Sequence, residues 1–97
     1  IGLTYSTSVD QIKNIVNDIQ KLVDDHEQTN QDGKVRFLNF GDSSLDVMVL
    51  YFVRSNEWDN LVDTQQEINF KIIEIVKKHG SDFAYPTTSV FLENQNN

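Results

Sequence analysis

The sequence predicts an α+β domain in which two helices pack on one face of a small β-sheet. Two long segments repeat apolar residues at the period of an α-helix, and short apolar stretches lie before, between and after them. Along the chain, these segments follow the order strand, helix, strand, strand, helix, strand. This is the order of a ferredoxin-like βαββαβ sandwich. A length of 97 residues suits one such domain.

The first strand and the first helix have local signals. Residues 1–5 alternate between larger apolar and smaller side chains, which predicts a short half-buried strand. Ser8 followed by Gln11 is a capping-box pattern, so a helix is predicted to begin there and to end near Asp25. The apolar face of this helix is predicted to comprise Val9, Ile12, Ile15, Val16, Ile19, Leu22 and Val23.

Two apolar stretches, residues 35–40 and 45–53, predict the next two strands. The second stretch carries apolar side chains on both faces, so we expect it to be the central strand, partly covered on each side. The residues between the two strands are typical of a turn: Gly41, Asp42, Ser43 and Ser44.

The second helix is predicted to begin at a cap formed by Asn56 and to end before Gly80, which suits the C′ position. Phe70 and Ile73 fall outside its main apolar stripe and broaden the apolar surface, which indicates either contact with a partner chain or burial inside the fold. The stripe itself is predicted to comprise Trp58, Leu61, Val62, Ile68, Ile72, Ile75 and Val76.

The last part of the chain predicts one more strand. Pro86 interrupts the sequence after the second helix, and residues 87–93 then alternate as a strand does. The domain is therefore expected to span residues 1–93, and the polar tail at 94–97 is expected to be disordered.

Composition excludes several classes of function. A net charge of −7 disfavours binding to nucleic acid or to anionic lipid headgroups. The chain has no cysteine, so disulfides and thiolate chemistry are absent. No apolar run approaches the roughly 20 residues that cross a bilayer, and the start at Ile1 without methionine suggests part of a longer protein.

Ser43 is the one candidate nucleophile, because Gly-Asp-Ser after an apolar stretch resembles the motif of GDSL-type serine hydrolases. That motif needs a strand-to-helix turn and a late Asp-x-x-His pair. Here a strand-like stretch follows Ser44, and valine stands three residues before each histidine. We therefore expect no enzymatic activity and no catalytic residue.

No cofactor or metal site is expected either. His26 and His79 are the only histidines, one at the end of each predicted helix, where a solvated or dipole-paired side chain is the commoner case. The acids Asp24, Asp25 and Glu27 lack the alternating ligand pattern of a calcium loop, so they predict a solvated acidic rim.

Four segments of the sequence resemble those of a known protein family. The segments "GLTYST", "RFLNFGDSSLDVMVLYFV", "WDNLVDTQQEINFKIIEIVKKHG" and "FAYPTTSVFLE" resemble, in this order, the C-terminal cytoplasmic domain of the small-conductance mechanosensitive channel (MscS) family. The resemblance covers residues 1–93. It implies a homoheptameric channel of a bacterial inner membrane that opens under bilayer tension and releases solutes on hypo-osmotic shock.

The resemblance assigns this chain to the lower part of a cytoplasmic vestibule, with membrane contact only through a preceding N-terminal part. In some members, the strand after the Tyr-Pro pair joins its symmetry mates in a small barrel. Thr88 departs from the basic or amide residue that many relatives carry at that position. The residues then expected at subunit interfaces are Phe70, Ile73, Tyr85, Pro86, Thr88, Val90 and Leu92.

Two hypotheses of other classes stay open beside the channel domain. A soluble ferredoxin-like module that regulates a partner or binds a small ligand would show the same patterns, and a stoichiometric ligand in calorimetry would favour it. A hydrolase is the weakest candidate, and ester hydrolysis that Ser43→Ala abolishes would support it.

Overall fold

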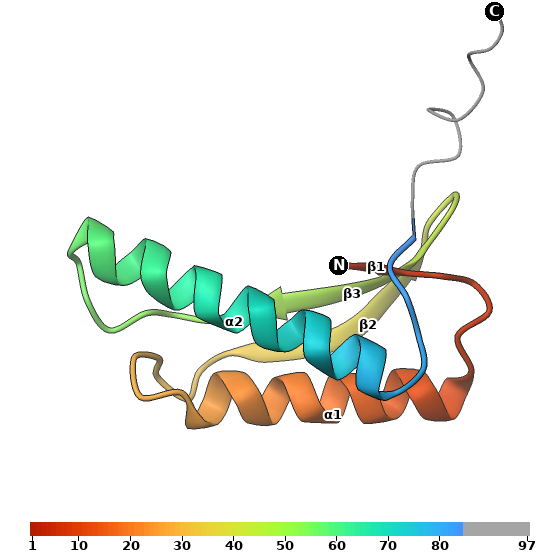
Figure 1. Cartoon of the computed structure of the whole chain (residues 1–97), viewed down its shortest axis with the longest axis horizontal. Coiled ribbons are helices and arrows are strands. Elements are labelled where there is room, and N and C mark those ends of the chain that lie inside the picture. The colour runs from red at the N-terminus through yellow and green to blue at the C-terminus, as the bar shows by residue number, and fades with distance from the viewer. Residues whose placement is uncertain (85–97) are drawn as a thin grey trace, which may run out of the picture.

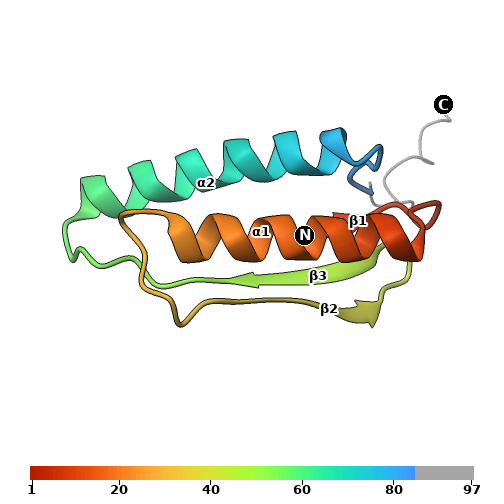
Figure 2. The same cartoon turned by 90° about the horizontal axis from the view of Figure 1, so that it is seen from below.

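The computed structural model describes residues 1–84 and confirms the α+β class. Two helices lie on one side of a three-stranded antiparallel sheet with the order β1-β3-β2 (Figures 1 and 2). The elements are β1 (Gly2–Leu3), α1 (Val9–Asp25), β2 (Lys34–Phe40), β3 (Leu45–Leu50) and α2 (Trp58–Lys78).

β3 is the central strand of the sheet, as its apolar composition predicts. One edge pairs with β2 over the whole length of β3, with an irregularity between Phe37 and Asn39. The other edge pairs with the short β1, where Leu3 lies opposite Leu45. This arrangement reproduces three strands of the predicted fold.

The chain returns to the free edge of β1 after α2. Phe83 forms an antiparallel bridge with Leu3, and the amide of Ala84 donates to the carbonyl of Gly2 at 3.0 Å. This is the edge at which a fourth strand stands in a ferredoxin-like sheet. The strand predicted at 87–93, its exchange between subunits and the tail at 94–97 lie outside the described residues.

α1 begins and ends as its local sequence predicts. The hydroxyl of Ser8 accepts the amide proton of Gln11, and the side chain of Gln11 accepts that of Ser8, which completes the capping box. At the other end, the buried hydroxyl of Thr29 donates to the carbonyl of Val23 at 2.5 Å. The prediction that Val9 belongs to the buried face is wrong, because the first residue of the helix is exposed.

α2 differs from the prediction at its start. The N-cap is Glu57 rather than Asn56, and no side chain caps the helix. Trp58 is not part of the buried stripe: it is 73% exposed, at an end of α2 that extends past β3 in Figure 1. The other end is as predicted, since Gly80 has a φ of 75° directly after the C-cap.

The core lies between the sheet and the two helices. Neither α1 nor α2, the two helices in the described part of the chain, combines the length and apolarity needed to cross a membrane. The buried apolar side chains come from all five elements and comprise Leu3, Ile15, Ile19, Val23, Val35, Leu45, Val47, Ile68, Ile72 and Val76.

Candidate functional site

Residues 41–44 connect β2 to β3 in a tight turn. The amide of Gly41 donates to the carbonyl of Ser44 at 2.7 Å. A Cβ atom on Gly41 would lie 2.9 Å from a carboxylate oxygen of Asp46 and 3.0 Å from the carbonyl oxygen of Ser44. A side chain at this position would therefore displace the Asp46 carboxylate and press against the Ser44 carbonyl.

Ser43 has no base beside it in the described part of the chain. Both histidines are hydrogen-bonded to carboxylates elsewhere, His26 to Glu67 and His79 to Asp18. A serine nucleophile needs a base within hydrogen-bond reach. Among residues 1–84, the turn therefore offers no nucleophile–base pair.

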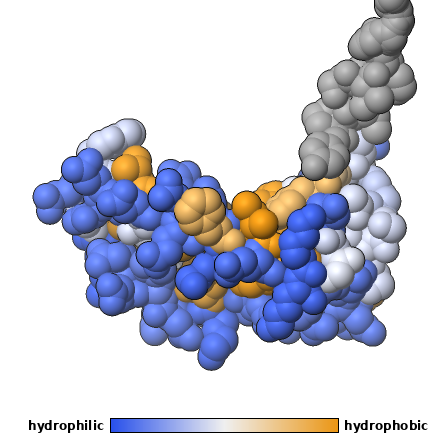
Figure 3. Space-filling model, in the orientation of Figure 1, coloured by the Kyte–Doolittle hydropathy of each residue, from blue (hydrophilic) through white to orange (hydrophobic). Residues whose placement is uncertain are grey.

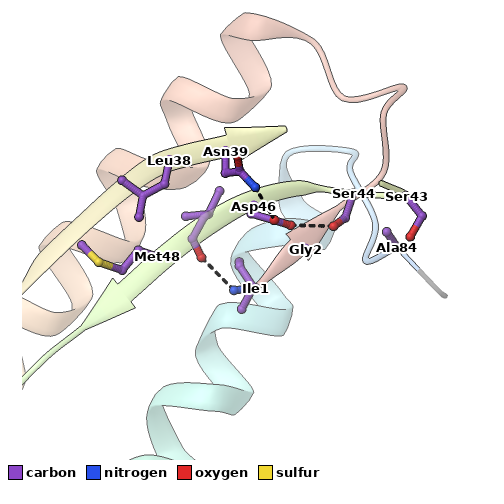
Figure 4. Close-up of a pocket in the computed structure, with 10 residues that line it drawn as sticks. Ile1, Gly2, Leu38, Asn39, Ser43, Ser44, Asp46, Met48 and Ala84 are labelled. Atoms are coloured by element: carbon purple, nitrogen blue, oxygen red, sulfur yellow. Dashed lines mark hydrogen bonds between the residues drawn. The ribbon is translucent and has the colours of Figure 1, made fainter. Parts of the chain in front are cut away.

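A shallow hollow lies beside this turn, with a volume of about 590 Å³ (Figure 4). Asp46 is its most polar group: Ser44 Oγ donates to the carboxylate at 2.5 Å and Asn39 Nδ2 at 3.3 Å. The hydrogen bond from Ser44 is the main reason that the pKa of Asp46 is lowered. Leu38 and Met48 line the rest of the hollow.

Two histidine–carboxylate pairs join α1 to α2, one near each end of the helix pair. His26 Nε2 lies 2.6 Å from Glu67 Oε1, and His79 Nε2 lies 2.6 Å from Asp18 Oδ2. His26 Nδ1 also accepts the amide proton of Gln28 at 3.0 Å, so Nε2 is the nitrogen that donates to Glu67. Both histidines were expected to be solvated or paired with a helix dipole, but each side chain is largely buried and pairs with a carboxylate of the other helix.

The pair at Asp18 predicts a pH dependence of stability. The pKa of Asp18 is lowered below 3.8, first by the hydrogen bond from His79 and further by the charge of Lys78. A carboxylate whose pKa is lower in the folded chain than in the unfolded chain stabilises the fold at pH values above 3.8, the unfolded pKa. This stabilisation is lost as the pH falls through the pKa of the folded state.

Asp18→Asn is therefore expected to lower the free energy of unfolding at pH 6, by an amount that shrinks as the pH falls below about 4. Urea unfolding of both chains between pH 7 and pH 2.5 measures this difference. Asp63→Asn is the control, because Asp63 lies exposed on α2 and forms no ion pair within residues 1–84. A constant difference across the whole range would contradict the prediction.

One exposed apolar surface lies on α2. Phe70 is 59% exposed and Ile73 is 46% exposed, so the two residues predicted to fall outside the buried stripe do so. Together with the half-buried Val62 they line a groove on the helix, and we call these three residues the α2 surface. Apolar side chains appear in Figure 3 between α2 and the N-terminal strand.

A second apolar surface lies on the face of the sheet that points away from the helices. Side chains of β3 alternate, so Val47 faces the core while Met48 and Leu50 face the other side. Leu38 on β2 is 63% exposed and lines the same hollow as Met48. We call Leu38, Met48 and Leu50 the outer sheet surface. On this face of β3, Met48 is half-buried and Leu50 is 42% exposed.

The remaining predicted interface residues, Tyr85, Pro86, Thr88, Val90 and Leu92, lie outside the described residues. Within residues 1–84, no three His, Asp or Glu side chains converge closely enough to hold a metal ion.

The outer sheet surface had a signal in the sequence, because residues 45–53 carry apolar side chains on both faces of the strand. That pattern leaves open whether both faces are covered.

Comparison with known proteins identifies the kind of protein that this chain resembles. Residues 1–83 match the model of the family described as "Mechanosensitive ion channel MscS, C-terminal". The small-conductance mechanosensitive channel MscMJ of Methanocaldococcus jannaschii is 42% identical over 99% of this chain. An MscS family protein of Aquifex aeolicus is 41% identical over 96%, and the low conductance mechanosensitive channel YnaI of Escherichia coli is 34% identical over 97%.

The matched region is a small part of each relative. The alignments cover 26% of the Aquifex protein, 27% of MscMJ and 28% of YnaI. This chain therefore spans about a quarter of the length of these curated relatives. Two of the three are named as mechanosensitive channels, and none is named as an enzyme.

Proposed function

This chain belongs to the MscS family of mechanosensitive ion channels, and from this premise we propose that it helps to assemble the cytoplasmic vestibule of a tension-gated channel. The proposed channel is a homoheptamer in a bacterial inner membrane that releases solutes on hypo-osmotic shock. The chain would lie on the cytoplasmic side, attached to the membrane through a preceding N-terminal part.

The main observation in favour of a role in assembly is the exposed apolar α2 surface. Phe70 and Ile73 lie close together on an exposed helix face, and a contiguous exposed apolar patch is typical of a protein–protein contact. Burying one such side chain against a partner contributes about 1.5–3 kcal/mol. Repeated at every contact of a ring, this contribution is large enough to matter for assembly.

The vestibule role draws support from charge. The chain carries 15 acidic and 8 basic residues, for a net charge of −7. Several copies around one chamber would raise the local concentration of cations, within the screening length of about 8 Å in physiological salt. The acids Asp24 and Asp25 at the end of α1 belong to this surface, although Lys21 pairs with Asp25 at 3.4 Å.

The test uses the full-length protein in a host that lacks other mechanosensitive channels. We expect tension-activated currents in excised patches and improved survival of hypo-osmotic shock. The double variant Phe70→Asp, Ile73→Asp should lose most of the assembled oligomer and most of the survival, because each carboxylate would have to be buried at a subunit contact. Native mass spectrometry of the solubilised protein measures the oligomer.

The matched control is Asn14→Asp, which adds a charge at an exposed position of α1. This variant should assemble and protect as the parent does. A parent protein that gives no current under tension would refute the proposed function. An unchanged oligomer in the double variant would refute the role of the α2 surface.

A further inference from the structure

An apolar groove of about 430 Å³ lies where α1 runs along β2. β2 is the edge strand on that side of the sheet, so no further strand of residues 1–84 covers the groove (Figure 1). The volume falls within the range of small-molecule pockets, about 300–1,000 Å³. The apolar wall consists of Val9, Ile12 and Val16 of α1 and Phe37 of β2.

This wall leaves apolar surface open along the helix. Val9 fits the apolar period of α1, yet it is 66% exposed. Val16 and Phe37 are half-buried and pack against the core on their inner side. Val9 and Val16 are two helical turns apart, which is about 10 Å along the helix axis. The groove therefore suits an elongated apolar chain.

Both charged side chains that line the groove are basic. They are Lys13 and Arg36, and neither forms an ion pair with an acid among residues 1–84. Asp10, one turn before Lys13, is exposed and does not line the groove. In a chain with 15 acidic and 8 basic residues, this groove is a local site of positive charge that favours an anion.

Arg36 is held beside the groove by uncharged acceptors. Its Nη1 donates to Gln20 Oε1 at 3.2 Å and to the carbonyl of Val35 at 2.8 Å. These bonds orient the guanidinium and leave its positive charge in place, with Nε and Nη2 as further donors. Asp24 accepts from Nε2 of the same glutamine at 3.1 Å, so its carboxylate is bound there and not to Arg36.

We propose that this groove binds one medium-chain carboxylate, with its apolar chain against Val9, Val16 and Phe37 and its carboxylate at Lys13 and Arg36. The chain gains by leaving water, and the two cations supply charge-assisted bonds. The occupant is a free molecule in solution, because a net charge of −7 disfavours contact with an anionic bilayer. The site goes beyond the proposed function, so each can fail without the other.

The test adds sodium decanoate to the 97-residue chain, without detergent and below the concentration at which decanoate forms micelles. Calorimetry should give one molecule bound per chain. Amide chemical shifts in NMR spectra should change mainly at residues 9–17 and 36–37. The double variant Lys13→Gln, Arg36→Gln should weaken binding about tenfold, as the loss of two exposed ion pairs does.

The matched control is the double variant Lys34→Gln, Lys71→Gln, which removes two positive charges from exposed positions outside the groove. It should bind decanoate as the parent does. Val9→Glu should abolish binding, because it places a like charge in the groove. An acid in the first turn of α1 suits the helix dipole, so this variant should remain folded.

A second probe separates a built site from general adsorption of an apolar chain. Decylamine has the same chain length as decanoate and the opposite charge. The net charge of −7 attracts decylamine to the surface as a whole, so adsorption without a site would favour the amine. We expect the reverse order at the groove, with decanoate bound more tightly.

Several results would overturn the proposal. They are the absence of decanoate binding, equal binding of the two probes, and equal weakening by the control variant. Broadening of the same amide signals when the chain is concentrated without a probe would show that a second copy covers the groove, and would overturn it too. The current under membrane tension tests the proposed function separately from all of these.

Discussion

Replacing Ile68 by alanine is expected to lower the free energy of unfolding by about 3 kcal/mol, the middle of the range for removing a buried isoleucine side chain. Ile68 is 0% exposed and lies in the core face of α2, among the apolar side chains of α1 and the sheet. Shortening it removes apolar contacts and leaves a cavity that a close-packed core fills only in part. Urea unfolding of the 97-residue chain measures the loss.

Phe70→Ala is the matched control for this prediction. Phe70 stands two residues later on the same helix and is larger, yet it faces outward. In the isolated chain its removal should change stability by no more than about 0.5 kcal/mol. Equal losses from the two substitutions would mean that α2 packs on the sheet through a different face from the one described.

Gly33→Ala is expected to lower the free energy of unfolding by about 2 kcal/mol, as overpacking of a close contact does. A Cβ atom at this position would lie 2.7 Å from the backbone oxygen of Leu50, and that oxygen belongs to the central strand. The clash meets backbone, so no side chain can rotate away to relieve it. β2 begins at the next residue, so relief would require the β2–β3 pairing to shift.

Alanine at position 33 also has a stabilising effect through the unfolded chain, and this effect is smaller than the expected cost of the clash. Alanine restricts the unfolded chain and so favours folding by about 0.4–1 kcal/mol where its geometry is tolerated. Asp32→Ala, at the exposed neighbouring residue, is the control and should leave stability within about 0.5 kcal/mol. A more stable Gly33→Ala chain would show that the approach of Gly33 to Leu50 is looser than described.

The sequence predicted well those features that depend on residues close together in the chain. The capping box of Ser8 and Gln11, the end of α1 at Asp25 and the positive φ of Gly80 each involve contacts within one turn of helix. The central position of β3 followed from the apolar side chains on both of its faces. Family membership also followed from the sequence, because it rests on the order of motifs along the chain.

The burial predictions failed for residues whose burial depends on how far the neighbouring elements extend along a helix. Trp58 and Val9 fit the helical period, yet each is the first residue of its helix and lies beyond the surface that the partner elements cover. Periodicity indicates which side of a helix faces the core. It does not show where along the helix the neighbouring elements stop covering that side.

The sequence by itself therefore determined the α+β class, the two helices, the central strand and the MscS family. Only the tertiary structure decided which distant residues meet and which apolar faces stay open. His79 finds Asp18 from 61 residues away, and Met48 and Leu50 face outward because both helices pack on the other side of the sheet. The physical reason is that local hydrogen bonds and periodicity act within a few residues, whereas such contacts exist only once separate elements have packed together.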